Sequence, residues 1–174
     1  FGCKGDGTTD DTTCLATALA AVTANGGQLY VPTGTYLTDP MTTTANSIII
    51  YGNGWGSIIK SRTTGALLTF GNSATTTHSI TIRDIAFQGF GSGSGNNGVV
   101  VSGSNERFNW KMSNVKLSAF GGTPFLSSGG AIFTSSWEDM DIDQPSGASG
   151  HGFDVLGSQT NSLKRIYVHN VATS

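Results

Sequence analysis

Charged residues are scarce in this 174-residue chain. Asp, Glu, Lys and Arg make up 11% of it, and the formal net charge is −2, whereas a typical soluble domain is roughly 25% charged. No cluster of Lys and Arg is present, so the composition excludes a nucleic acid or an anionic membrane surface as the expected partner. The longest apolar runs, such as 48–51, are too short to span a bilayer. We therefore expect no nucleic-acid partner and no membrane segment.

Cysteine and helix-forming residues are also few. Gly, Ser, Thr and Asn dominate, while stretches rich in Leu, Glu, Lys or Ala are rare, which disfavours a largely helical protein. The two cysteines, Cys3 and Cys14, are too few for a disulfide framework. Because Cys14 falls on the apolar stripe of a predicted helix, we interpret it as a buried free thiol, with one Cys3–Cys14 bridge as the alternative. What remains is a β-rich and turn-rich chain.

Residues 11–24 have the periodicity of a one-sided helix. Its apolar positions follow the i, i+3/i+4 spacing: Cys14, Leu15, Ala18, Leu19 and Val22. Asp10 and Asp11 stand at its start and Asn25-Gly26-Gly27 at its end, which are favourable capping residues. A short strand is predicted directly after it, at 28–32.

A repeat runs through the rest of the chain. The pattern apolar-x-x-apolar-x-apolar occurs four times, at Ile82/Ile85/Phe87, Met112/Val115/Leu117, Trp137/Met140/Ile142 and Leu163/Ile166/Val168. A second strand type, which begins with Gly, falls between its copies at 98–101, 130–133 and 152–155. Short strands that recur every 25–30 residues are typical of a parallel β-helix, in which each coil buries its inward row against its neighbours. A β-sandwich, the alternative, gives no reason for this constant spacing.

The N-terminal 60 residues resemble a known family. Phe1-Gly2-Cys3-Lys4-Gly5-Asp6-Gly7-Thr8-Thr9-Asp10-Asp11-Thr12, Gly26–Tyr36 and Tyr51–Gly56 are similar to the N-terminal motif of pectate-lyase-like right-handed β-helix proteins, which include phage tailspike depolymerases, secreted polysaccharide lyases and exo-glucanases. The resemblance implies an all-β, right-handed parallel β-helix. We expect one domain, residues 1–174, with a capping α-helix at about 11–24 and coils at about 28–174. The ends of the sequence suggest the N-terminal portion of a longer chain.

Two carboxylates in the third repeat are the candidate catalytic groups. Aligning the repeats places Asp141 in an outward column with Lys116 and Tyr167, and Asp143 in the next column with His169. Residues i and i+2 on a strand share a face, and two strand rises separate these carboxyls by about 6–7 Å. That distance suits an inverting glycosidase, and adjacent carboxylates raise one pKa as a general acid requires.

Other functions for this face remain open at the level of the sequence. His169, Tyr167 and Lys116 beside the carboxylates also suit a lyase, in which a base removes a ring proton next to a neutralised sugar carboxylate. A solvated polar face without chemistry is the plain alternative. Trp55, in a predicted coil corner, is the candidate sugar-stacking residue, whereas the repeat predicts that Trp110 and Trp137 point inward. The repeat also pairs Glu138 with Lys164 and Asp139 with Arg165 as structural charge matches.

We expect neither a metal nor another cofactor. Asp6, Asp10 and Asp11 resemble a calcium loop superficially but lack the bidentate Glu of such a loop. The resemblance implies a tailspike-type depolymerase that cleaves a bacterial surface polysaccharide, forms a homotrimer and resides in the virion (phage tail). The alternatives are a secreted pectate lyase or exo-glucanase, and a non-catalytic receptor-binding β-helix.

Overall fold

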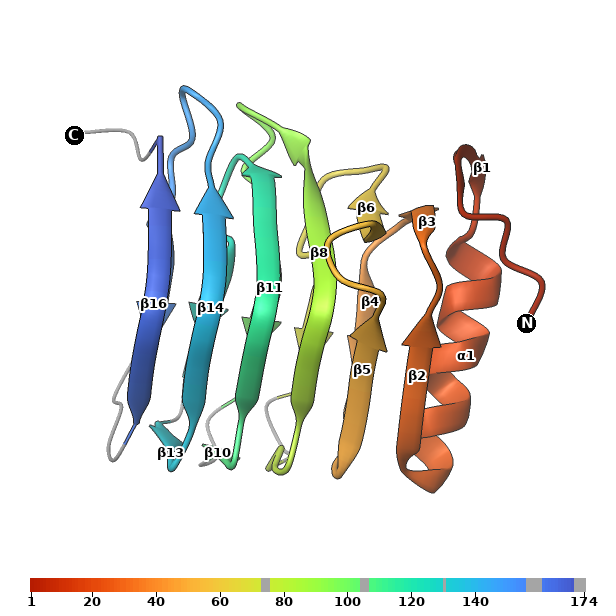
Figure 1. Cartoon of the computed structure of the whole chain (residues 1–174), viewed down its shortest axis with the longest axis horizontal. Coiled ribbons are helices and arrows are strands. Elements are labelled where there is room, and N and C mark those ends of the chain that lie inside the picture. Colours follow the sequence, from red (N-terminus) through yellow and green to blue (C-terminus); the bar gives the residue numbers. More distant parts are fainter. Residues whose placement is uncertain (73–75, 104–106, 130, 156–160, 171–174) are drawn as a thin grey trace.

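The chain folds into an all-β parallel solenoid of about six turns. The computed structural model describes residues 1–72, 76–103, 107–129, 131–155 and 161–170. Every strand pairing in it is parallel, and each strand hydrogen-bonds to the corresponding strand of the next coil. In Figure 1 the long strands stand side by side from the N-terminal end to the C-terminal end. The predicted β-helix is confirmed.

Three sheets run along the solenoid in the described part of the chain. The largest contains β1 (Asp6–Asp10), β2 (Gly27–Val31), β3 (Gly34–Thr38), β5 (Ile48–Gly52), β6 (Ser57–Ser61), β8 (Thr81–Gly91), β11 (Lys111–Phe120), β14 (Ser136–Asp143) and β16 (Ser162–His169). The second contains β4 (Met41–Thr43), β7 (Leu68–Phe70), β9 (Val99–Val101), β12 (Phe125–Ser127) and β15 (Phe153–Val155). The third pairs β10 (Arg107–Phe108) with β13 (Ile132–Phe133).

The inward ladders stack in the register that the repeat predicts. Val115 pairs with Ile85 on one side and Met140 on the other, and Met140 pairs with Ile166. The first three of these side chains are fully buried. The core is therefore a column of like apolar residues, because each coil can cover its inward row only with the rows above and below it.

In each long strand one residue with a left-handed backbone conformation forms a corner. This corner explains why the three apolar positions of the repeat are separated by three residues and then by two. Asp84, Asn114, Asp139 and Arg165 all have φ between 51° and 55° and occupy equivalent positions in β8, β11, β14 and β16. The register pairs flank these residues and omit them. Each long strand therefore bends at its corner residue, and Asn and Asp tolerate this backbone conformation better than most residues. Beyond the bend the side chains again point alternately into the core and towards solvent.

The strands predicted at 98–101, 130–133 and 152–155 do not all belong to one sheet. β9 and β15 pair with β12, which follows Pro124, and the described part of 130–133 forms β13 in the third sheet. Residue 130 itself lies outside the described residues. The Gly-apolar pattern does not indicate which sheet a short strand joins, because the lengths of the turns decide which sheet it reaches.

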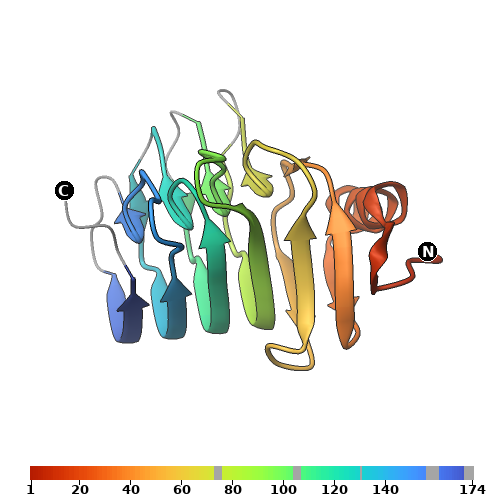
Figure 2. The same cartoon turned by 90° about the horizontal axis from the view of Figure 1, so that it is seen from above.

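Helix α1 (Thr12–Asn25) covers the N-terminal end of the core. It buries Leu15, Ala18 and Leu19 and packs against β2, β3 and β4, as the red helix at the end of the row in Figure 2 shows. A solenoid end has unpaired edges and an uncovered core, and this helix closes it. At its start the Asp10 carboxylate accepts a hydrogen bond from the Thr12 N–H at 2.9 Å.

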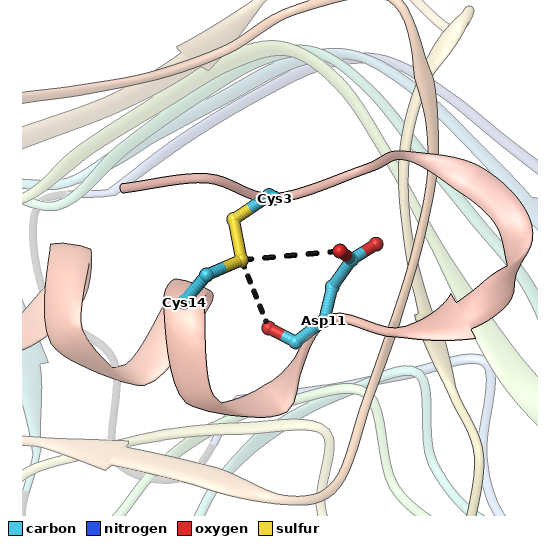
Figure 3. Close-up of side chains that lie close together, drawn as sticks. All are labelled: Cys3, Asp11 and Cys14. Carbon is cyan, nitrogen blue, oxygen red and sulfur yellow. Dashed lines mark hydrogen bonds between the residues drawn. A yellow bond between two sulfur atoms is a disulfide. The ribbon is translucent and has the colours of Figure 1, made fainter.

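The prediction of free thiols is wrong, because Cys3 and Cys14 form a disulfide (Figure 3). Their Cα atoms are 5.4 Å apart, within the range that a disulfide needs. The N-terminal segment folds back over the first turn of α1, where the buried Asp11 carboxylate accepts hydrogen bonds from the N–H groups of Lys4 and Gly5 at 2.7 and 3.1 Å. This return of the chain is a tertiary feature that the spacing of two cysteines does not reveal.

Reducing this disulfide should destabilise the N-terminal cap. The two cysteines are 11 positions apart in the sequence, and opening a loop of that size costs about 3 kcal/mol through the entropy of the unfolded chain. We expect dithiothreitol to lower the midpoint of thermal unfolding, which is monitored by circular dichroism. The Cys3→Ser/Cys14→Ser protein is the control, since it should unfold at the lower midpoint with or without reductant. Equal midpoints for the oxidised and reduced protein would contradict the stabilising role.

The opposite end of the solenoid is open in the described structure. Leu163 and Val168 of β16 belong to the inward rows but are 56% and 43% exposed, because the described strands include none that pairs with the outer edge of β16. The described residues also contain no helix with the length and apolar character needed to cross a membrane.

Candidate functional site

Two outward columns on the largest sheet bring the candidate residues together. One column contains Thr35, Ile58, Ala86, Lys116, Asp141 and Tyr167. The other contains Leu37, Lys60, Gln88, Ser118, Asp143 and His169. The positions that the repeat assigns to both carboxylates, His169, Lys116 and Tyr167 are therefore those of the structure. Their shared face results from the alternation of side chains along each strand beyond the corner.

Asp141 lies between two potential cations. Its Oδ1 is 3.9 Å from Lys116 Nζ and 3.8 Å from His169 Nε2. The same oxygen is buried and has no hydrogen-bond donor within the part of the chain that the structure describes. Buried carboxylate oxygens are normally hydrogen-bonded. Asp141 Oδ1 therefore faces two potentially cationic side chains but accepts a hydrogen bond from neither.

Asp143 is held differently, although it is only two residues away. Its Oδ1 accepts a hydrogen bond from Asn170 Nδ2 at 2.8 Å. His169 pairs with Asp143 in the strand register, but the contact found for its imidazole is with Asp141 in the neighbouring column. The two carboxylates therefore have unequal surroundings, a condition for different acid and base roles.

Trp55 reaches this face from an earlier coil. It lies in the loop between β5 and β6, and its Nε1–H donates a hydrogen bond to the backbone oxygen of Asn114 at 3.2 Å. Lys116 Nζ lies 5.4 Å from the centre of its ring, within the range of a cation–π contact. Trp110 and Trp137 are fully buried, as predicted, whereas Trp55 is 41% exposed.

Two depressions open on this face. The aromatic depression has a volume of about 280 Å³ and is lined by Trp55, Asn114, Asp139, Met140, Asp141 and Tyr167. The polar depression has a volume of about 820 Å³, and its lining includes Lys116, Asp143, Asn170 and the connection 144–147. Asp141 and Asp143 thus line different hollows. Lys116 lines the polar depression and lies 3.9 Å from Asp141 Oδ1.

Ion pairs fix the corner next to the aromatic depression. Glu138 pairs with Lys164 at 3.2 Å, and Asp139 Oδ2 accepts from Arg165 Nη2 at 2.9 Å, which confirms both predicted charge matches. Hydrogen bonding from Arg165 lowers the pKa of Asp139 below its ordinary value. A hydrogen bond from Asn114 to Asp84, at 2.9 Å, likewise lowers the pKa of the Asp84 carboxyl. These carboxylates stabilise the corner and are not free for chemistry.

Several residues of this face were not found by sequence analysis. Asn114 aligns with Asp84 and Asp139 in the repeat, and this alignment was the signal available for its corner role. Asn170 and the 144–147 connection lie beyond the last position of the aligned pattern. Turns that follow a repeat vary in length, so their contribution to a site needs coordinates.

The acidic N-terminal loop and the cysteine cluster are structural. Asp6 accepts hydrogen bonds from the N–H groups of Thr9 and Thr8 at 2.7 and 2.8 Å, which lower its pKa well below the ordinary value. Cys3, Asp11 and Cys14 lie close enough together to be considered metal ligands. The disulfide uses both sulfurs, however, and the Asp11 carboxylate already accepts two backbone hydrogen bonds.

Comparison with solved structures identifies the same fold in sugar-acting and viral proteins. The A-module of the mannuronan C-5 epimerase AlgE4 from Azotobacter vinelandii is 18% identical, with a TM-score of 0.61 over 88% of this chain and 51% of that module. ORF18 of Geobacillus virus E2 is 21% identical, with a TM-score of 0.52 over 94% of this chain and 39% of that protein. A glycosyl hydrolase-like protein of Parabacteroides merdae is 14% identical, with a TM-score of 0.64 over 100% and 96% of the two chains.

The chain spans about half the length of the AlgE4 module, and these identities establish the fold alone. No curated protein sequence is similar enough to count as a relative. The family described as "Rhamnogalacturonase A/epimerase, pectate lyase-like", whose β-helix members act on polysaccharides, matches residues 1–174. That match spans the capping helix, every coil and the face that carries Asp141, so the chain belongs to the rhamnogalacturonase A/epimerase, pectate lyase-like family.

Proposed function

We propose that this protein is a polysaccharide depolymerase of the phage tailspike type, which cleaves glycosidic bonds of a bacterial surface polysaccharide. The observation that carries the proposal is Asp141, whose buried Oδ1 faces Lys116 and His169 at 3.9 and 3.8 Å and has no donor among the described residues. A carboxylate in this state beside a second carboxylate, in a polysaccharide-acting family, is a natural acid–base centre.

Each side chain of the face has a part in cleavage. In hydrolysis one carboxyl of the Asp141/Asp143 pair gives its proton to the glycosidic oxygen as the C–O bond breaks, and the other takes a proton from the attacking water. His169, whose Nε2 lies 3.8 Å from Asp141 Oδ1, stabilises the charge on Asp141. Lys116 binds acidic or hydroxyl groups of the sugar, while Trp55 and Tyr167 stack on sugar rings.

A lyase route uses the same residues in another order. A base takes the ring proton next to a sugar carboxylate that Lys116 neutralises, the C–O bond to the leaving sugar breaks, the leaving oxygen takes up a proton from water, and a double bond remains in the product. The two routes therefore leave different products, saturated oligomers from hydrolysis and unsaturated ones from elimination.

The tailspike assignment is supported by the phage protein among the structural relatives and by the low charge of the chain. With it we propose that the chain is the N-terminal portion of a longer homotrimeric virion protein. A second candidate, a secreted pectate-lyase-like enzyme, is favoured by the Cys3–Cys14 disulfide, since disulfides form mainly in oxidising compartments.

Product analysis tests the function. The protein is incubated with polygalacturonate, rhamnogalacturonan, mannuronan and a panel of purified capsular polysaccharides, and products are followed by size exclusion, reducing ends and ultraviolet absorbance. We expect one polymer to be shortened. Inverted sugar configuration without shortening would assign the chain to the epimerase branch. Binding without any product would leave a receptor-binding β-helix, and either result would contradict the depolymerase.

A further inference from the structure

The aromatic and polar depressions lie one after the other along the strands. The aromatic depression is lined by residues 55, 114, 139–141 and 167, and the polar depression by residues 88, 116, 118, 119, 143–147 and 170. Residue numbers rise in the same direction along each parallel strand, so the polar depression lies further along β11, β14 and β16. A line that joins the two hollows therefore runs with the strands and across the solenoid axis. It passes over Asp141 and Asp143.

The two hollows offer different chemistry to a sugar chain. Trp55 and Tyr167 give the aromatic depression exposed ring surface, which suits the apolar face of a pyranose. The polar depression presents the Lys116 ammonium together with amide and hydroxyl side chains such as Gln88, Ser118 and Asn170, which suit hydroxyl and acidic substituents. Sugar residues can thus be held on both sides of the carboxylate pair.

The far wall of the polar depression is preformed. The connection from β14 to β15 is anchored to the preceding coil, because Gln144 Nε2 donates to Gly122 O at 3.0 Å and the Ser149 N–H donates to Gly121 O at 2.8 Å. An added Cβ at Gly150 would lie 2.4 Å from the Gly122 backbone. A wall packed this closely keeps its shape before a ligand arrives, which lowers the entropy cost of binding.

The path along the axis is less suited to a sugar. Beyond Lys116, the column of Asp141 continues towards the N-terminus through Ala86 and Ile58, which offer no hydrogen-bonding side chain. The column of Asp143 continues through Ser118 and Gln88, which line the polar depression, to Lys60. A polymer on the Asp141 column would leave the polar depression, the larger of the two hollows, at its side.

We propose that the polysaccharide crosses the solenoid along the strand direction, from the aromatic to the polar depression, and that the 144–147 connection selects which sugar is accepted. This inference rests on the proposed function for its substrate class. The chain then has at least one sugar residue on each side of the bond above Asp141 and Asp143. The β14–β15 connection, the light-blue loop above the β14 arrow in Figure 1, is the specificity element.

Trp55 provides a direct reporter of this path. The other two tryptophans, Trp110 and Trp137, are fully buried, so quenching of the fluorescence by acrylamide reports on Trp55. In the Asp141→Asn protein, which should bind without cleaving, we expect at least one polymer of the same set, which is polygalacturonate, rhamnogalacturonan, mannuronan and the panel of purified capsular polysaccharides, to protect Trp55 from acrylamide. Protection by none of these polymers overturns the proposal.

Two matched substitutions distinguish the two paths. Ser146→Tyr places a bulky ring on the wall of the polar depression, and Lys60→Tyr places the same ring on the axial path; both sites are on the surface. We expect Ser146→Tyr to raise the half-saturating polymer concentration at least tenfold and Lys60→Tyr to change it less than twofold. The reverse order, or no effect of either, overturns the proposed path.

Failure of the path and failure of the function give different results. Cleavage by the unsubstituted protein, together with no effect of Ser146→Tyr on protection, would leave the depolymerase and remove the path across the strands. Protection that Ser146→Tyr weakens, together with no cleavage of any polymer, would leave the path and remove the depolymerase.

Discussion

Replacing Asp141 by Asn should lower the turnover of the cleaved polysaccharide by about 10²–10⁴-fold, the range for loss of a general acid or base. The amide keeps the shape of the side chain but cannot take up or release the proton. The contacts of Oδ1 with Lys116 and His169, at 3.9 and 3.8 Å, would then surround a neutral group. The measurement is kcat from reducing-end formation at saturating polymer, with the unfolding midpoint recorded for the same preparation.

Asp154→Asn is the matched control for this substitution. Asp154 lies in β15, in a different sheet, next to none of the six candidate residues, and its replacement should leave kcat within twofold. Asp143→Asn should also reduce kcat strongly, because the second carboxylate acts in the same cleavage. If Asp141→Asn retained full turnover with an unchanged unfolding midpoint, the proposed site would be wrong.

Replacing Trp137 by Ala should cost about 3–5 kcal/mol of unfolding free energy, as is usual when a buried Trp or Phe is removed. Trp137 is fully buried, and its ring lies edge-on to Phe125 and Phe153, with centroids 5.9 and 5.7 Å away. Each coil is stabilised by its neighbours, so a cavity at this level loosens the coils on both sides. Urea unfolding followed by circular dichroism measures the loss.

Two further variants make the stability result specific. Tyr167→Ala removes an aromatic ring that is 58% exposed on the neighbouring coil, and a surface change of this kind should alter the free energy by at most about 0.5 kcal/mol. Trp137→Phe should cost less than Trp137→Ala, since it keeps an aromatic ring and removes a buried Nε1–H for which the described residues include no acceptor. Equal losses for Trp137→Ala and Tyr167→Ala would contradict the inward orientation.

The state of the two cysteines was predicted incorrectly from the sequence. A buried free thiol was expected at Cys14, whereas Cys3 and Cys14 form a disulfide. Cys14 does lie near the buried face of α1, where it is half-buried, and the periodicity identified that position correctly. Periodicity describes one helix, whereas a disulfide depends on where a distant segment returns.

The sequence predicted the pairing of the long strands correctly and did not predict the pairing of the short ones. The long strands carry three inward residues each, at Ile82, Ile85 and Phe87 for example, and three matching positions fix a register. The short strands of the second sheet carry too little pattern, so the sequence did not identify residues 125–127 as the strand between β9 and β15. A strand of three residues is positioned by the turns around it more than by its own side chains.

By itself the sequence determined the solenoid, its capping helix, the inward ladders and the two outward columns that contain Asp141 and Asp143. These features depend on repetition, because residues at equivalent positions of successive coils must stack. Only the tertiary structure decided that Trp55 reaches Asn114 two coils away, that His169 contacts Asp141, and that the turn after β14 walls a depression. Side-chain reach and turn length are not periodic, so no pattern along the chain encodes them.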